Sequence, residues 1–217
     1  MRRAFAYKYA VAYLNCQGSL AGLELLTEVN LMPDRVVRTG RNLVHKGNIV
    51  DFYTDDIKLP DGRCETYDFI CHKGAAAILP VLPDGRLLMV KQYRNAVDQF
   101  TIELPAGGRN TADEPTIDCA YRELEEETGY YSAKEDIKLL LSLYTTVAFC
   151  NEKIDIYYTT GKLTRTEQHL DDDEYIDVAA YTLEELVKLV YEGKIVDAKT
   201  IAAIMTYKSM VTDAVVR

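Results

Sequence analysis

Residues 108–130 read GRNTADEPTIDCAYRELEEETGY, and the second half of this stretch predicts an amphipathic helix. Pro115 suits the first turn of a helix and Gly129 suits the position just after its last turn, so we expect a helix from 115 to 128. At about 100° per residue, the apolar and small side chains fall on one arc. These are Ile117, Ala120, Tyr121, Leu124 and Thr128. The helix is therefore expected to pack against a core through this face.

Three carboxylates occupy a second arc beside the apolar one. Glu123, Glu126 and Glu127 are spaced i, i+3 and i+4, whereas Glu125 points away from both arcs. Like charges at this spacing repel one another by a few tenths of a kcal/mol per pair, so a cation is expected nearby. Clustered carboxylate oxygens suit a hard divalent ion such as Mg²⁺ or Mn²⁺. For the bare string, a solvated acidic face is the alternative interpretation.

The string belongs to a longer pattern, Gly108-x5-Glu114-x7-Arg122-Glu123-Leu124-x-Glu126-Glu127-x-Gly129-Tyr130. This pattern resembles the box of the Nudix hydrolase superfamily at every charged and glycine position. The one departure is Tyr130, where the family usually carries an aliphatic residue. The resemblance implies an α/β (α+β) fold, the Nudix α/β/α sandwich with a mixed sheet, in which a loop-helix-loop holds metal.

Roles for individual residues follow from the same resemblance. Glu123 and Glu127 are expected to be the principal metal ligands, with Glu127 also taking part in catalysis. Glu126 is expected to be a third ligand or the partner of one, oriented by Arg122 at i+4, and the backbone carbonyl of Ala106 a further ligand. The cofactor is expected to be Mg²⁺, with Mn²⁺ as an alternative. The remaining box residues are expected to be structural: Gly108, Glu114, Arg122 and Gly129.

Four further stretches resemble the ADP-ribose pyrophosphatase branch of the superfamily. They are His72-Lys73-Gly74-Ala75, Val90-Lys91-Gln92-Tyr93-Arg94, Glu103-Leu104-Pro105-Ala106-Gly107 and residues 193–200, GKIVDAKT. The resemblance implies that Arg94 contacts a substrate phosphate. It also implies that Glu152, in the loop 145–152, is a catalytic carboxylate that takes a proton from the attacking water. Without the resemblance, these two would be an exposed arginine and a polar loop residue.

Two departures bear on the substrate. Residues 146–148 are Thr-Val-Ala where the branch usually has Ser-Pro-Gly, and Tyr67 stands where many members have an arginine that binds substrate. Tyrosine cannot replace a guanidinium on phosphate. We retain Tyr67 and Tyr53 as candidate substrate-binding residues, Tyr53 because an aromatic ring can stack on a base, although packing is the commoner role.

The expected activity is therefore metal-dependent hydrolysis of a nucleoside diphosphate sugar, with ADP-ribose giving AMP and ribose 5-phosphate. Alternatives are GDP-mannose or another nucleotide sugar, or a non-catalytic Nudix module that senses a nucleotide sugar. An mRNA-decapping enzyme is disfavoured, because the net charge of −9 and pI near 4.9 do not suit a nucleic-acid binder.

Composition further limits the class of protein. No segment approaches the roughly 18 apolar residues that span a bilayer, so no membrane association is expected. Residues 1–15 faintly resemble a signal peptide, but Lys8 interrupts the apolar run, and we expect a cytoplasmic protein. The five cysteines are scattered without a C-x-x-C pair, which predicts a reducing compartment and no structural zinc.

Turn signals predict the remaining organisation. The turns at residues 60–62 and 83–85, both Pro-Asp-Gly, predict hairpins that pair 48–59 with 63–71 and 75–82 with 86–93. Further strands are expected at 101–104, 137–144, 153–160 and 175–181. A helix should begin after a capping box formed by Thr182 and Glu185, and a last helix should begin at Asp197.

The first hairpin exceeds what the Nudix sandwich needs, so we expect two parts: residues 1–74 as an N-terminal extension with a β-hairpin arm for dimerisation, and residues 75–217 as the Nudix hydrolase domain. An isolated hairpin is only marginally stable, so it must pack on something. Members of the resembled branch commonly exchange this segment around a two-fold axis. We therefore expect a homodimer, and packing of the hairpin on its own domain is the alternative.

Overall fold

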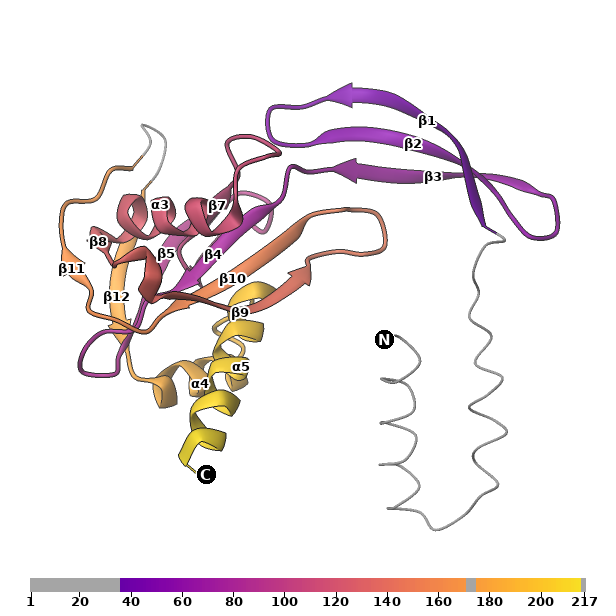
Figure 1. Ribbon diagram of the computed structural model, residues 1–217. Coiled ribbons are helices and arrows are strands. Elements are labelled where there is room, and N and C mark those ends of the chain that lie inside the picture. Colours follow the sequence, from indigo (N-terminus) through magenta and orange to yellow (C-terminus); the bar gives the residue numbers. More distant parts are fainter. Residues whose placement is uncertain (1–35, 171–174, 216–217) are drawn as a thin grey trace, which may run out of the picture. The chain divides into compact units, whose positions relative to one another are not determined.

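The computed structural model describes residues 36–170 and 175–215 (Figure 1). The strands are β1 (Val37–Lys46), β2 (Asp51–Lys58), β3 (Cys64–Cys71), β4 (Ala75–Leu79), β5 (Leu87–Arg94), β6 (Gln99–Glu103), β7 (Ala106–Gly108), β8 (Tyr130–Tyr131), β9 (Ile137–Tyr144), β10 (Lys153–Thr159), β11 (Thr164–Arg165) and β12 (Asp177–Tyr181). The helices are α3 (Thr116–Thr128), α4 (Leu183–Tyr191) and α5 (Ala198–Val215), with a 3₁₀ turn η1 (Lys134–Asp136). The first 35 residues of the expected extension, with Cys16, lie outside the described residues.

Two sheets form the centre of the fold. One is mixed, in the order β7-β4-β10-β9, with β4 parallel to β10 and the other pairs antiparallel. The second is antiparallel, in the order β12-β5-β6. All five residues of β4, Ala-Ala-Ala-Ile-Leu, are buried. A strand that is apolar on both faces must be covered on both faces, and here helices supply the cover.

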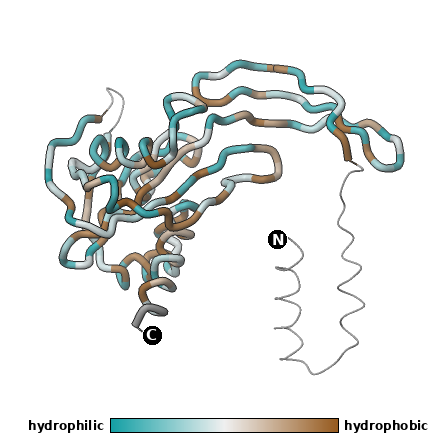
Figure 2. The backbone as a smooth tube through the Cα atoms, viewed as in Figure 1, coloured by the Kyte–Doolittle hydropathy of each residue, from teal (hydrophilic) through white to brown (hydrophobic). Residues whose placement is uncertain are grey.

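Alternate residues of the central strands enter two different cores. Ala75, Ala77 and Leu79 face a core completed by α4 and α5, whereas Ala76 and Ile78 face a core completed by α3. Figure 1 shows α3 on one side of the sheets and α4 with α5 on the other. In Figure 2, hydrophobic stretches of the tube gather where the central strands meet α5. The expected mixed α/β sandwich is confirmed.

The predicted hairpin between 75–82 and 86–93 is wrong. β4 and β5 belong to different sheets, and near the turn they share only a bridge between Val81 and Leu87. The buried β4 has β7 and β10 as its two neighbours, so no edge is left for β5. The Pro-Asp-Gly turn is present, but it connects two sheets.

The predicted hairpin between 48–59 and 63–71 is confirmed as β2 and β3, with one addition. β1 joins β2 to make a three-stranded sheet, β1-β2-β3. Its sequence, VRTGRNLVHK, lacks the alternation that marks a half-buried strand. Within this sheet the guanidinium of Arg41 donates two hydrogen bonds to Asp55, at 2.6 and 2.7 Å.

By its contacts the chain divides into two units. Of the described residues, one unit comprises 36–41 and 55–66, and the other comprises 42–54, 67–170 and 175–215. The second unit contains both central sheets, the three helices and every candidate site residue named above. The domain boundary expected at residue 74 stays a prediction.

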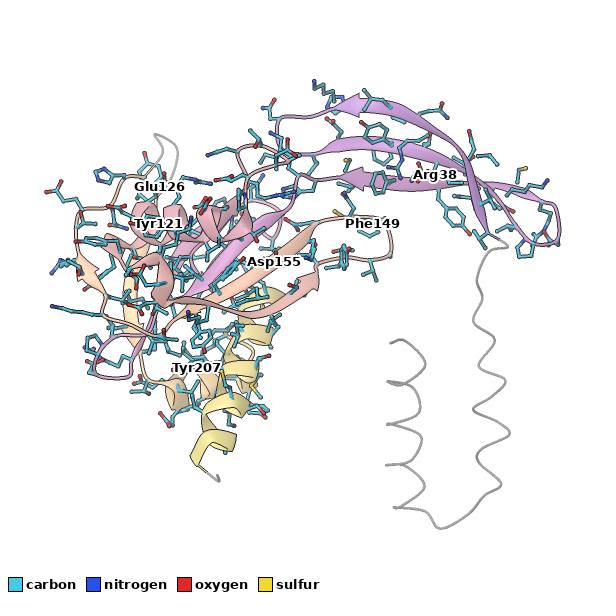
Figure 3. The ribbon with its side chains drawn as sticks, viewed as in Figure 1. Arg38, Tyr121, Glu126, Phe149, Asp155 and Tyr207 are labelled. Atoms are coloured by element: carbon cyan, nitrogen blue, oxygen red, sulfur yellow. The ribbon has the colours of Figure 1, made fainter. Side chains whose placement is uncertain are left out.

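α3 is attached to the sheet at its first residue and ends at a glycine. The hydroxyl of Thr116, its first residue, donates at 2.8 Å to Asp155 of β10, a residue labelled in Figure 3. Gly129 ends the helix in the left-handed conformation, with φ of 66°, as the sequence predicts. Pro115 precedes the first helical residue instead of occupying the first turn. The capping box of Thr182 and Glu185 at the start of α4 is confirmed.

Within the part of the chain that the structure describes, no helix is both long and apolar enough to cross a membrane.

Leu124→Ala should lower the free energy of unfolding by about 2–5 kcal/mol, because Leu124 is fully buried in the core under α3 and truncation leaves a cavity. Leu139→Ala is the matched control: this leucine on β9 is 55% exposed, and its loss should cost no more than about 0.5 kcal/mol. Urea unfolding followed by circular dichroism measures both. Equal losses would contradict the packing of α3.

Candidate metal and phosphate site

Two carboxylates on α3 are buried. Glu123 is 7% exposed and Glu127 is 3% exposed, and both lie on the side of the helix that packs against β7. Burial of an ionised carboxylate is costly unless it meets partners, so these positions call for an explanation beyond packing. The helical spacing places them one turn apart, as the sequence predicts.

The backbone of β7 meets these carboxylates directly. The amide of Ala106 donates to Glu127 Oε2 at 2.9 Å. A Cβ atom placed on Gly107 would lie 2.1 Å from Glu123 Oε1, so the carboxylate occupies the space that any other residue would fill. The two acidic side chains and the Ala106–Gly107 backbone thus form one cradle.

Arg122 closes this cradle on its outer side. Its Nη1 donates to Glu123 Oε1 at 2.6 Å and to Glu126 Oε2 at 2.9 Å. Its Nη2 donates to the carbonyl of Gly108 at 3.1 Å, and Nε lies 3.7 Å from Glu114 Oε1. Burial opposes the charge, yet Glu123 and Glu126 raise the pKa of Arg122 above its ordinary value. Arg122 therefore joins the loop before α3 to the helix.

The donor set suits a divalent cation with open coordination positions. Glu127 brings a carboxylate oxygen to Ala106 and Glu123 brings one to Gly107, whereas Glu126, which is labelled in Figure 3, is partly exposed and pairs with Arg122. Among residues 36–170 and 175–215, no three acidic, histidine or cysteine side chains are grouped tightly enough to enclose an ion. Two carboxylates match Mg²⁺, which usually takes one or two protein carboxylates and leaves positions for water and phosphate.

A second charged cluster is centred on Glu103, which lies shortly before the Ala106–Gly107 backbone of the cradle. Arg94 at the end of β5 donates through Nε and Nη2 to the two oxygens of Glu103, at 2.8 and 2.7 Å. Lys199 of α5 also donates to Glu103 and, at 3.0 Å, to Asp197. Burial raises the pKa of Glu103, but Arg94 and Lys199 outweigh it and lower that pKa to about 2.

The sequence predicts a site role for Arg94 but indicates none for Glu103 or Lys199. Both lie within stretches that carry the family resemblance, 103–107 and 193–200, and this was the only available signal. Their pairing joins residues 96 positions apart. No local pattern in the sequence marks such a contact.

Glu152 lies on a loop that is attached to the end of β3. The Thr145 hydroxyl donates to Glu152 Oε2 at 2.8 Å, and His72 Nδ1 lies 3.5 Å from Oε1. Next to it, Asn151 accepts the amide of His72 through its side chain at 2.8 Å. The carboxylate therefore has a defined position with one side held by a hydroxyl.

The two candidate aromatic residues lie in the three-stranded sheet. Tyr53 packs against Phe69, with ring centroids 6.1 Å apart, whereas Tyr67 on β3 is 51% exposed. The structure groups neither of them with Glu123 and Glu127. Their binding of substrate stays a prediction.

Comparison with known proteins gives a family and a fold. A family model described as NUDIX domain matches residues 72–204. The ADP-ribose pyrophosphatase of Bacillus subtilis is 35% identical over 162 residues, which cover 74% of this chain and 86% of that protein. The methanol dehydrogenase activator of Bacillus methanolicus is 33% identical over 80% of this chain and 92% of its own.

A solved structure described as an ADP compounds hydrolase covers 83% of this chain and 96% of its own, with a TM-score of 0.72 and 17% identity. At that identity the likeness concerns the fold alone. It matches the mixed sheet with helices on both faces described above.

Gly107→Ala should weaken Mn²⁺ binding by at least about tenfold, because the new Cβ would displace the Glu123 carboxylate from the cradle. Gly108→Ala is the matched control, since a Cβ at Gly108 meets nothing within 4 Å. Isothermal titration calorimetry with Mn²⁺ measures both variants. Unchanged affinity in Gly107→Ala would contradict the placement of Glu123.

Proposed function

The chain belongs to the NUDIX family of diphosphate hydrolases, and we propose that it hydrolyses a nucleoside diphosphate sugar, with ADP-ribose as the preferred substrate and Mg²⁺ as the cofactor. The observation that carries this proposal is the cradle formed by Glu123, Glu127 and the Ala106–Gly107 backbone, together with the cationic Arg94, which is bound to Glu103 just before that backbone. A site of this composition suits a diphosphate accompanied by a divalent ion.

The proposal that Mg²⁺ is the cofactor is supported by the oxygen atoms that the cradle offers as metal ligands. Nudix hydrolases generally use divalent ions. Glu123, Glu127 and the carbonyl of Ala106 would hold the ion, with Glu126 and Arg122 orienting the ligands from outside. When bound, a divalent ion supplies Lewis-acid polarisation of a phosphate oxygen and lowers the pKa of the attacking water. Mn²⁺ is a chemically reasonable substitute.

The chain's own residues supply the remaining steps. Arg94 presents a guanidinium that suits a phosphate oxygen of the substrate. Glu152, held by the Thr145 hydroxyl, accepts the proton of the water as its oxygen bonds to phosphorus. The bond from that phosphorus to the bridging oxygen breaks, and ADP-ribose yields AMP and ribose 5-phosphate.

The choice of sugar nucleotide rests on the relatives. The Bacillus subtilis protein is named an ADP-ribose pyrophosphatase, and it aligns over most of both chains. GDP-mannose is the alternative substrate. The second relative is named an activator of methanol dehydrogenase, so a regulatory role is an alternative of a different class. All four box glutamates are present here, which favours catalysis.

We further propose that the protein is a cytoplasmic homodimer, with no nucleic acid or membrane as partner. Leu43 and Val44 are neighbours on β1, so their side chains point to opposite faces of the three-stranded sheet, and they are 52% and 56% exposed. A sheet with apolar side chains open on both faces favours cover by a second copy. The four described cysteines, Cys64, Cys71, Cys119 and Cys150, are free thiols, which suits a reducing compartment.

The substrate proposal is tested by assaying ADP-ribose, GDP-mannose, dinucleotides and nucleoside triphosphates with Mg²⁺. We expect the highest kcat/KM for ADP-ribose and loss of activity on chelation, because the buried carboxylates then lack their ion. A tenfold preference for a triphosphate would overturn the substrate assignment. Full activity after exhaustive chelation would overturn the cofactor assignment.

Glu127→Gln should lower kcat by about 10²-fold or more, because a neutral amide cannot replace a carboxylate ligand. Glu125→Gln is the matched control on the same helix, and kcat should stay within about twofold because its side chain points away from the cradle. Steady-state kinetics at saturating Mg²⁺, with circular dichroism to verify folding, decides between them. Equal losses would refute the orientation of α3.

Multi-angle light scattering at micromolar concentration should give twice the mass of the 24.6 kDa chain. Replacing Leu43 and Val44 together by serine should shift the protein towards monomer, since both exposed apolar groups are removed. Leu139→Ser, an equally exposed leucine on β9, is the control and should leave the mass unchanged. A fully active wild-type monomer would defeat the dimer proposal.

A further inference from the structure

Glu103 is an unusual residue because it is an acidic side chain that is only 2% exposed and lies outside the metal cradle. Its oxygens accept hydrogen bonds from Arg94, Lys199 and the Thr101 hydroxyl, the last at 2.6 Å. A buried carboxylate that collects this many donors is fully ionised and fixed in place.

The pairing with Arg94 uses only one edge of the guanidinium. Nε and Nη2 both point to Glu103, and the side chain is still 40% exposed. A guanidinium has five N–H donors, so Nη1 and the outer hydrogen of Nη2 remain for another acceptor. The two hydrogen bonds to Glu103 on one edge of the guanidinium fix its plane. They thereby fix the direction in which the opposite edge points.

Arg94 also lies within electrostatic range of the metal cradle. The hydrogen bonds that Arg94 donates to Glu103 raise the pKa of Arg94 most, and the charges of Glu127 and Asp197 add to that shift. The guanidinium of Arg94 is thus anchored by Glu103 and lies near Glu127, which belongs to the cradle.

α5 supports the anchor from the other side. Lys199 and Thr200 are adjacent in its first turn, and Thr200 Oγ1 accepts the amide of Leu104 at 2.9 Å. Lys199 is itself neutralised by Asp197 as well as by Glu103. Residues 103 and 104 are therefore both held by α5, directly before the Ala106–Gly107 cradle.

We propose that Glu103 is a positioning residue, which locks the inner edge of Arg94 so that its outer edge faces the substrate diphosphate, while Lys199 secures Glu103 and does not contact substrate. This inference rests on the proposed function, because the direction of Arg94 matters only if the substrate carries a phosphate that Arg94 binds. Glu103 itself touches neither substrate nor metal. Its effect on catalysis should pass entirely through Arg94.

The test is a double-mutant cycle between Glu103→Gln and Arg94→Ala, assayed with ADP-ribose and Mg²⁺. An amide offers one oxygen acceptor, so it cannot accept from both Nε and Nη2 of Arg94, as the two carboxylate oxygens do. Glu103→Gln alone should raise KM by about tenfold or more, with a smaller change in kcat. In the Arg94→Ala background, Glu103→Gln should change kcat/KM by less than about twofold.

Glu103→Gln also leaves Arg94 and Lys199 without their shared negative charge, so loss of stability must be separated from loss of positioning. The variant Glu103→Gln with Lys199→Met removes one of these cations, and its melting temperature should rise above that of Glu103→Gln. Its KM should stay high, because Arg94 is still unlocked. Glu192→Gln, which breaks the exposed pair with Lys194, is the matched control and should leave both quantities unchanged.

The outcomes separate the two claims. A wild type that hydrolyses no member of the substrate panel overturns the proposed function and this inference with it. An active wild type in which Glu103→Gln costs the same with and without Arg94 overturns the inference alone. Recovery of KM together with melting temperature in the double variant would show that Glu103 only neutralises Lys199.

Discussion

Glu123 and Glu127 lie buried on α3 against the backbone of Ala106 and Gly107, and much of the surrounding structure serves this contact. It requires glycine at 107, because any side chain there would occupy the position of the Glu123 carboxylate. It also requires α3 to keep its rotation and its distance from β7. Thr116 fixes the first turn through Asp155, and the packed face below Leu124 fixes the rest.

The segment after β11 fixes the far end of the helix. The amide of His169 donates to the carbonyl of Glu126 at 3.0 Å, and the Gln168 side chain donates to that of Glu127 at 2.6 Å. Carbonyls in a helix's last turn lack intrahelical partners, and these donors satisfy them. α3 therefore has a defined position at both ends, and this fixes where the carboxylates of Glu123 and Glu127 lie.

Charge is balanced locally although the chain as a whole is acidic. Arg122 serves Glu123 and Glu126, and Arg94 with Lys199 serves Glu103. Because a buried carboxylate is costly without such partners, each acidic group is placed together with its donor. The loop 103–107 lies between these two systems, with α3 holding one end and α5 holding the other. Displacing either helix would disturb the same loop.

The sequence by itself determined the helix α3, the glycine that ends it and its two arcs, because helical periodicity and capping are local properties of neighbouring residues. It also determined the family, since the box is a pattern of fixed spacing. Only the tertiary structure decided that β4 pairs with β7 and β10 instead of β5, that β1 forms a third strand beside β2, and that Glu103 joins Arg94 to Lys199. These features depend on contacts between segments that are far apart in the chain, where several segments could pair with one sheet edge or one buried charge. The spacing of residues along the sequence does not predict which segment does so.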